Sequence, residues 1–560
     1  MFAVRARPGT LRQVAPQLNR RAILRAAGVA AASGAVFTTL PRLATADPDG
    51  DEQHVFRHGV ASGDPLPDRV VLWTRVTPTD DAHPGSGRGP SSTVRWEVAT
   101  EDDFREVVRS GEVETGPGRD HTVKVDVSGL DPATRYAYRF RLGGATSPVG
   151  RTRTAPAHGA AVNRLRLGVV SCANWQAGFF AAYRYLAERD DLHAVVHLGD
   201  YFYEYGSRQY PMGYDIRTHE PATETITLSD YRRRHGQYKT DPDLRALHAK
   251  TPWICMWDDH EVANDRWSGG AENHDPESEG SYGARRAAAY RAYFEWMPVR
   301  PDDIPLYRRL RFGTLADLSM LDLRSYRSKQ VRPFSAEADD PGRTLTGRAQ
   351  FDWLADGLAD SSARWKLVGN PVMIAPLLIP PLPREQLGAL LNVLGLPAEG
   401  GVLATDQWDG YAADRRRLLS TISRRRVSDV VFLTGDIHTS WANDVPVDAG
   451  SYPLSPSVAT EFICCSITSD SVGDLLHAPP RTTSLGVETA IKTLNRHVRF
   501  VELDSHGSTV LTVTPGEVRM DWYYLDNRAR RDSPSRLAHS HRVSSGTPRI
   551  VGPPLPVSLP

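Results

Sequence analysis

Three short clusters of carboxylate, phenol and imidazole side chains stand out in the sequence. Asp200-Tyr-Phe-Tyr203 can offer two oxygens to one cation, although an Asp at a strand end can also be a helix cap. Asp258-Asp259-His260-Glu261 is denser. Burying its charges costs free energy that a cation would offset, and a solvated, charged loop is the alternative. In Gly435-Asp436-Ile-His438, an extended chain would put Asp436 and His438 on one side, as a shared metal site requires.

Two further residues could add donors of other kinds. Cys172 follows the apolar run 165–170 and offers a thiolate, and Asn370 follows the run 365–369 and offers a neutral oxygen. The combined set suits a hard, oxygen-rich centre with more than one metal ion, rather than a structural zinc. Paired cations are a standard device for in-line attack at phosphorus. The sequence has no Walker-type phosphate loop and no Gly-x-Ser-x-Gly elbow, which disfavours a Ser–His–Asp hydrolase.

The elements that must position these residues are strands that alternate with helices. Apolar runs at 164–170, 194–198, 254–257 and 429–434 each end at one of the polar clusters, and 179–189 has helical spacing. In α/β proteins, sites form beyond the carboxyl ends of the strands, so we expect the clusters to converge. Strand-like runs at 510–513 and 518–524 indicate that hairpins complete a layered fold.

The region before this alternation reads as an all-β unit. Residues 70–76, 94–99, 121–127 and 134–140 are β-rich runs separated by turn signals, which is typical of an immunoglobulin- or fibronectin-like sandwich. A chain of 560 residues is too long for one compact core. We therefore predict a β-sandwich domain at 47–158 and a catalytic domain at 162–545.

Residues 1–46 read as a targeting segment. Twin arginines, Arg20 and Arg21, precede a modest apolar run at 26–40, and the small residues 44–46 offer a cleavage site. The pattern resembles a twin-arginine (Tat) signal peptide; a disordered basic arm with a short helix is the alternative. We therefore expect the Tat export machinery as a partner and a secreted or extracytoplasmic location. The run is too short for a permanent membrane span.

Charge and cysteine content exclude several other classes of protein. Basic and acidic residues both number 67, and seven of the arginines lie in the first 46 residues, so the rest of the chain is mildly acidic. We find no evident nucleic-acid-binding domain. Four cysteines are too few for the disulfide framework of a small exported protein. Cys255, Cys464 and Cys465 lie in apolar runs and read as buried hydrophobic residues.

The order and spacing of the clusters resemble those of a known family. The carrying stretches are 171–173, Leu198-Gly-Asp-Tyr-Phe-Tyr-Glu204, Trp257-Asp-Asp-His-Glu-Val-Ala-Asn264, Gly369-Asn370 and Gly435-Asp-Ile-His438, with support from 56–65, 321–327 and 406–411. Over roughly 54–550 the chain resembles PhoD-type alkaline phosphatases, which belong to the calcineurin-like metallophosphoesterases. The resemblance implies an α/β fold: a four-layer α/β/β/α sandwich preceded by a small all-β domain.

The resemblance also implies a ferric ion with calcium, Fe³⁺ and Ca²⁺. The residues implied to hold the iron are Cys172, Asp200, Tyr203 and His438. Asp200 would bridge to the calcium, and Asp259 and Asp436 would serve the calcium side. Asp258 and Asn370 are further implied metal residues. His260, with Asn264, would contact the phosphoryl or leaving group. Asp259 and Asp436 stand where the wider superfamily has Asn and His, and both changes harden the site toward calcium.

The function implied is that of a secreted alkaline phosphatase or phosphodiesterase, which hydrolyses phosphate mono- or diesters by metal-activated hydroxide attack on phosphorus. Some relatives are iron- and calcium-dependent phospholipases D, so a phospholipase D acting on headgroup diesters is one alternative. An apolar stretch at 374–382 and 387–396 could then touch a phospholipid surface. A non-catalytic exported binding protein is a second alternative. The basic segment 527–541 either packs near the site or forms a solvated tail.

Overall fold

The computed structural model describes residues 52–210, 213, 215–378, 404–475, 477 and 479–552. The predicted export signal at 1–46 and most of the apolar stretch after Asn370 lie outside these residues. Among the helices in the described ranges, none is long and apolar enough to cross a membrane.

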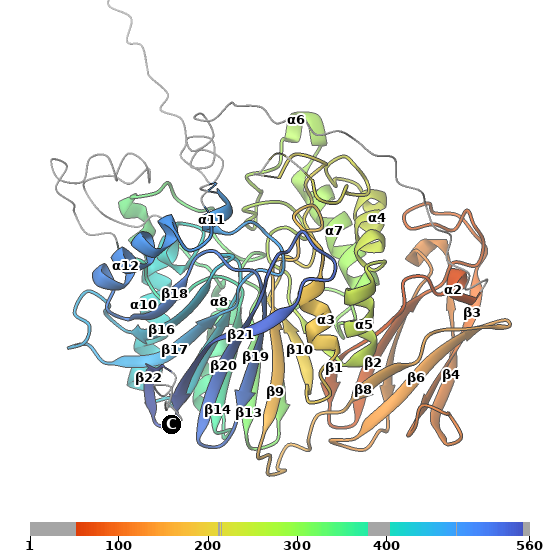
Figure 1. The fold of residues 1–560 in the computed structure, drawn as a ribbon, viewed down its shortest axis with the longest axis horizontal. Helices are drawn as coiled ribbons and strands as arrows, with labels where there is room; N and C mark the ends of the chain where they lie inside the picture. Colours follow the sequence, from red (N-terminus) through yellow and green to blue (C-terminus); the bar gives the residue numbers. More distant parts are fainter. Residues whose placement is uncertain are drawn as a thin grey trace, which may run out of the picture.

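Two large sheets form the centre of the molecule (Figure 1). The ten-stranded sheet has the spatial order β22 (Thr547–Val551), β21 (Ser535–Ser544), β20 (Glu517–Leu525), β19 (Gly507–Val513), β9 (Leu165–Val170), β10 (Ala194–His197), β11 (Trp253–Cys255), β1 (Val60–Leu66), β2 (Arg69–Arg75) and β5 (Thr122–Ser128). The seven-stranded sheet has the order β12 (Arg308–Phe312), β13 (Ala316–Met320), β14 (Trp365–Asn370), β15 (Val430–Thr434), β17 (Ser457–Ile463), β16 (Ser440–Pro446) and β18 (Val498–Glu502).

Helices cover the outer face of each sheet. The longer helices are α3 (Ala181–Ala187), α4 (Leu228–Tyr238), α5 (Pro242–Lys250) and α7 (Tyr282–Trp296) on the ten-stranded side, and α8 (Arg348–Asp360), α10 (Ala412–Arg424) and α12 (Thr483–Leu494) on the other. The short ones are α2 (Glu52–Val55), α6 (Pro276–Glu279), α11 (Val472–Leu475), η1 (Pro117–Arg119), η2 (Ala336–Asp339) and η3 (Trp408–Tyr411). The predicted α/β/β/α layering is confirmed.

The apolar runs explain why the sheets are central. Every residue of β10, β14 and β15 is buried, as expected for parallel strands covered on both faces. One hydrophobic core fills the space between the sheets, and a second lies under α8 and α10. In α8 the buried residues include Phe351, Leu354 and Leu358, the spacing of an amphipathic helix.

The N-terminal region is all-β, as predicted, but its strands join two different sheets. A five-stranded sheet contains β4 (Val107–Thr115), β3 (Ser92–Ala99), β6 (Arg135–Leu142), β7 (Ala145–Thr146) and β8 (Gly150–Arg153). By contrast, β1, β2 and β5 extend the ten-stranded sheet, where Gly63 of β1 pairs with Trp253 of β11. A Cβ on Gly63 would lie 2.0 Å from the Pro298 carbonyl oxygen, so only glycine permits this approach. The boundaries 47–158 and 162–545 stay predictions.

The basic C-terminal segment is not a solvated tail. Residues 535–544 form β21, which pairs along its length with β20, and Figure 1 shows these blue strands beside β19. Ahead of the strand, buried Arg528 donates to the Thr468 carbonyl oxygen and to Asp470 Oδ1, the latter at 2.7 Å. The carbonyl of Asp470 in turn lies 2.8 Å from His438 Nδ1. The segment therefore supports the loop that places a predicted site residue.

Candidate metal centre

The predicted metal residues converge at the carboxyl ends of strands from both sheets. Cys172 follows β9, Asp200 follows β10, Asp258 and Asp259 follow β11, and Asp436 follows β15. Potential ligand atoms lie within 4.8 Å of one another in three overlapping sets: Cys172, Asp200 and His438; Asp200, Asp259 and His260; and Asp200, Asp258, Asp259 and Asp436. Asp200 belongs to all three sets, which makes it the shared centre of the site.

The backbone at these positions is unusual. Four of the predicted ligands have positive φ, namely Cys172 (60°), Asp200 (55°), Asp436 (63°) and His438 (59°). Non-glycine residues rarely adopt this conformation, and such strain is typical of functional sites. The sequence-based expectation that 436–438 is extended is therefore wrong, because β15 ends at Thr434 and a bend follows. The bend still brings Asp436 and His438 to the same centre.

Sulfur, phenol and imidazole donors gather on one side of Asp200. The Tyr203 hydroxyl donates to Asp200 Oδ2 at 3.0 Å and lies 3.0 Å from His438 Nε2. Burial, reinforced by the Asp200 carboxylate, raises the pKa of the Cys172 thiol and of the Tyr203 phenol well above their ordinary values. The other oxygen of Asp200, Oδ1, is buried without a hydrogen-bond partner in the described chain. This donor set fits a cation, which offsets the cost of burying thiolate and phenolate.

Carboxylates gather on the other side of Asp200, together with a buried arginine. Arg324 donates to both carboxylate oxygens of Asp258, from Nε to Oδ1 and from Nη2 to Oδ2, the latter at 2.7 Å. Its Nη2 also donates to Asp436 Oδ1 at 2.8 Å. Its Nη1 lies 3.7 Å from Asp259 Oδ2. Burial raises the pKa of Asp258 well above its ordinary value, and the Arg324 charge opposes this rise. Arg324 thus engages both oxygens of Asp258, one of the predicted metal residues, and the metal contact of Asp258 stays a prediction.

A second buried carboxylate ties two of the loops together. Glu261 Oε1 accepts from the Tyr201 backbone nitrogen at 2.7 Å, and Oε2 accepts from the Asp258 backbone nitrogen at 2.9 Å. Since Tyr201 follows Asp200, this one side chain fixes the separation of the loops after β10 and β11. Gly199 makes the close packing possible, since a Cβ there would lie 2.5 Å from the Asp258 Cβ.

His260 lies between Glu204 and the carboxylates. Its Nδ1 is 2.7 Å from Glu204 Oε2, and its ring lies 4.0 Å from the Tyr203 ring, centroid to centroid. Burial opposes a charge on His260, but Asp259, Glu204 and Asp200 outweigh burial and raise its pKa well above the ordinary value. The carboxylates around His260 therefore favour the protonated form of its ring.

The two asparagines of the predicted site have protein partners. Asn264 donates from Nδ2 to Glu272 Oε2 at 2.7 Å, and its backbone nitrogen donates to Glu204 Oε1. Asn370 accepts from Trp408 Nε1 at 2.9 Å and donates to the Val372 carbonyl oxygen at 2.6 Å. The substrate contact of Asn264 and the metal contact of Asn370 stay predictions.

Four residues that support the site were not predicted as site residues: Glu204, Glu261, Arg324 and Gln407. Gln407 donates to Asp436 Oδ2 and accepts from the Met373 backbone nitrogen. All four lie within the stretches that carried the family resemblance, so the signal was present in the sequence. What was missing was their partners, which come from distant parts of the chain.

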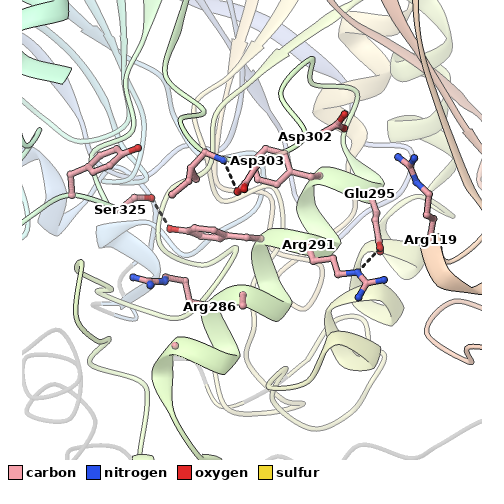
Figure 2. A pocket seen from close by; sticks show the side chains of 13 residues that line it. Arg119, Arg286, Arg291, Glu295, Asp302, Asp303 and Ser325 are labelled. Carbon is pink, nitrogen blue, oxygen red and sulfur yellow. Dashed lines mark hydrogen bonds and ion pairs between the residues drawn. The ribbon is translucent and has the colours of Figure 1, made fainter. Parts of the chain in front are cut away.

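A pocket of about 630 Å³ lies along one face of α7 (Figure 2). Figure 2 shows Arg286 and Ser325 on one side of it and Arg119 and Arg291 on the other, and the Tyr290 hydroxyl lies 2.7 Å from Ser325 Oγ. Tyr290 also stacks on Trp257, the residue before Asp258, with centroids 4.3 Å apart. The wall of this pocket therefore supports the metal loops from behind.

Comparisons with known proteins agree with this architecture. The family model described as PhoD-like phosphatase matches residues 167–522, and the model of its N-terminal domain matches 42–156. The chain is 39% identical to alkaline phosphatase D of Bacillus subtilis (strain 168) over 482 residues, which cover 83% of this chain and 77% of the relative. A solved structure described as "Structure of PhoD" has a TM-score of 0.80 and 36% identity, covering 91% of this chain and 94% of that one.

The matched family and the shared fold confirm the resemblance inferred from the motifs. They exclude the alternative of a non-catalytic binding protein. The clusters of buried carboxylates and histidines offer donors that could hold metal ions. The chain belongs to the PhoD-like phosphatase family and is a phosphoric ester hydrolase of the alkaline phosphatase D type.

Proposed function

We propose that the protein is an exported alkaline phosphatase and phosphodiesterase that uses Fe³⁺ and Ca²⁺ to hydrolyse phosphate esters. The observation that supports it most is the meeting of Cys172, Tyr203 and His438 with three Asp carboxylates around Asp200. Sulfur, phenol and imidazole ligands favour iron, and a purely carboxylate set favours calcium. When bound, the ions would polarise the phosphoryl oxygens and lower the pKa of a water.

The residues of the chain divide into those that hold the ions and those that handle the proton. Cys172, Asp200, Tyr203 and His438 would hold iron, with Asp200 reaching the calcium beside Asp259 and Asp436. His260 donates from Nδ1 to Glu204, which leaves its Nε2 proton for the oxygen of the leaving alcohol. Arg324 supplies fixed positive charge next to Asp258 and Asp436, which limits repulsion among the carboxylates.

The proposal is tested by Asp200→Ala together with a substrate panel. We expect the variant to lose at least about 10³-fold in kcat, because the shared ligand is gone, while its far-UV circular dichroism stays that of the wild type. Exposed Asp352→Ala is the matched control and should keep full activity. Persistent turnover in Asp200→Ala would show that the cluster is wrongly assigned.

The choice between phosphate esters and phospholipids is decided by the same panel. Ile374 and Ala375, at the start of the apolar stretch, are buried in the second core, and residues 379–403 lie outside the described chain. We propose that phosphomonoesters and simple diesters are cleaved faster than phosphatidylcholine. A much higher kcat/KM for phosphatidylcholine would contradict this and favour a phospholipase D.

Export is proposed from the sequence pattern of residues 1–46: the twin arginines, the apolar run at 26–40 and the small residues at 44–46. Replacing Arg20 and Arg21 together by Lys should keep the protein in the cytoplasm, because the Tat machinery reads the arginine pair. Cell fractionation of the variant, compared with a variant of Arg42 only, measures this. Normal export of the double variant would exclude the Tat route.

A further inference from the structure

A polar pocket lies at the amino ends of β10 and β11, opposite to the carboxyl ends of these strands, where the metal centre lies. Its volume is about 580 Å³. One wall comes from β6 and β8 of the five-stranded sheet, and the other from residues 189–192 and 250–252, which directly precede β10 and β11. Since those strands carry the metal residues at their carboxyl ends, the pocket is separated from the centre by their length, roughly 10–15 Å.

Two arginines of this pocket are forced together. Arg135 of β6 and Arg153 of β8 are directly paired in the antiparallel register. Like charges directly opposite each other repel; because Arg135 is exposed, solvent screens part of this repulsion, and a bound anion would remove the rest. Among the described residues, the one hydrogen bond that either guanidinium donates runs from Arg135 Nη2 to the Asp190 backbone oxygen, at 2.9 Å. This bond brings no negative charge.

Two of the three acidic side chains that line the pocket are paired with other bases, and the third, Glu101, forms no ion pair among the described residues. Asp102 pairs with Arg151, and Asp190 pairs with Lys250. Within the part of the chain that the structure describes, neither Arg135 nor Arg153 forms an ion pair with a carboxylate. Five basic and three acidic residues line the pocket, so the lining carries an excess of two positive charges.

The positive charge of the two arginines helps to lower the pKa of neighbouring basic groups. Burial and then the charge of Arg135 lower the pKa of Arg153. Burial and then Arg153 and Arg135 lower the pKa of His193, next to the pocket-lining Leu192, to about 4. A pocket that holds two guanidinium groups without carboxylate partners suits an oxyanion.

We propose that this pocket is a second oxyanion site, in which Arg135 and Arg153 bind a phosphate group that is either free or carried by an ester. Paired guanidinium groups bind phosphate oxygens with charge-assisted hydrogen bonds. A bound phosphate cancels the repulsion across β6 and β8 and joins the five-stranded sheet to the start of β10 and β11. The inference rests on this pocket alone and does not require the proposed metal assignment.

The test is the stoichiometry of phosphate binding. Inorganic phosphate is titrated calorimetrically into the full-length, metal-loaded protein, and the inhibition constant of phosphate in the hydrolysis assay is measured in parallel. We expect wild type to bind one phosphate that competes with substrate and a second that does not. The double variant Arg135→Gln/Arg153→Gln should lose the second site, or bind there roughly tenfold or more weakly, with an unchanged inhibition constant.

Arg141→Gln is the matched control, because Arg141 is an exposed arginine on the same strand, β6, outside the pocket. It should keep both sites. If the wild-type protein binds only one phosphate, and that phosphate competes with substrate, the proposal is overturned. This result needs no variant, so the test stays valid even if the double variant misfolds. A second site that survives in a folded double variant overturns it as well.

Phenylphosphonate, which the enzyme cannot hydrolyse to phosphate, distinguishes the two sources of the anion. Binding of both phosphate and phenylphosphonate at the second site supports an ester-borne phosphate. Binding of inorganic phosphate only supports the free anion, the product of the reaction. Failure of both probes to bind outside the metal centre overturns the site. A failure of the metal proposal would instead appear as loss of the competitive site.

Discussion

Arg324 donates two hydrogen bonds to Asp258 within a cluster of buried carboxylates, and both side chains are nearly inaccessible to solvent. The two residues are 66 positions apart in the sequence. The pair sets the arrangement of the acidic side of the site, since the same guanidinium reaches Asp436.

Removing this charge should be costly. Arg324→Gln leaves Asp258 buried without its partner, and we expect a loss of about 3–5 kcal/mol in the free energy of unfolding. Chemical denaturation of the metal-free proteins measures it. Arg348→Gln is the control, since Arg348 makes an exposed ion pair with Asp352 and should cost less than about 1 kcal/mol. Equal stability of the two variants would contradict the role given to Arg324.

Glu204 should act on catalysis through His260. Glu204→Gln keeps the shape of the side chain but removes the charge that holds the imidazolium, and we expect kcat to fall by about 10²–10⁴-fold with little change in KM. The pKa of His260 should also fall, which moves the alkaline limit of the kcat profile to lower pH. A KM effect with an unchanged pH profile would show that Glu204 only supports the loop.

Glu220→Gln provides the comparison for this experiment. Glu220 pairs with the exposed Arg233 on the surface, so its substitution should leave both kcat and the pH profile as they are in wild type.

The lowered pKa of buried Lys239 leads to a prediction of how the stability of the fold depends on pH. This lysine is completely buried, contacts the Tyr201 hydroxyl at 2.8 Å, and burial lowers its pKa to about 7. Above this pH the folded protein releases the proton, while the unfolded chain keeps it until about pH 10.4. The unfolded state then binds more protons, so the free energy of unfolding should rise by up to about 1.4 kcal/mol per pH unit from pH 7 toward pH 10.

Lys239→Met should remove this contribution to the slope, and exposed Lys492→Met should keep it. Denaturation midpoints between pH 7 and pH 10 provide the measurement. Parallel pH dependences of wild type and Lys239→Met would mean that Lys239 stays charged in the folded protein.

The position of the site could be predicted from the sequence because each apolar run that forms a strand ends at one of the site residues. The apolar runs before Cys172, Asp200, Asp258 and Asp436 do form buried strands, because a continuous apolar run is stable only when both faces are covered. Parallel strands then bring their carboxyl ends together. This local pattern was enough to identify the convergence of the polar clusters and the layered fold.

Other features could not be predicted because they depend on distant partners. The bend at 436–438 places Asp436 and His438 in left-handed backbone, for which Asp and His have only a weak preference, so the local sequence does not specify it. Arg324 and Glu261 become site residues only through contacts with the loops after β10 and β11. Likewise, β1 joins the catalytic sheet through the approach of Gly63 to Trp253, a pairing that strand patterns within 47–158 do not reveal.

The most direct test of the metal centre is elemental analysis of purified wild type, Cys172→Ser and Asp259→Asn, combined with circular dichroism to verify folding. We predict iron and calcium in the wild type, loss of iron with calcium retained in Cys172→Ser, and loss of calcium with iron retained in Asp259→Asn. A fully active wild-type protein without iron, or unchanged iron in folded Cys172→Ser, would contradict the proposed centre.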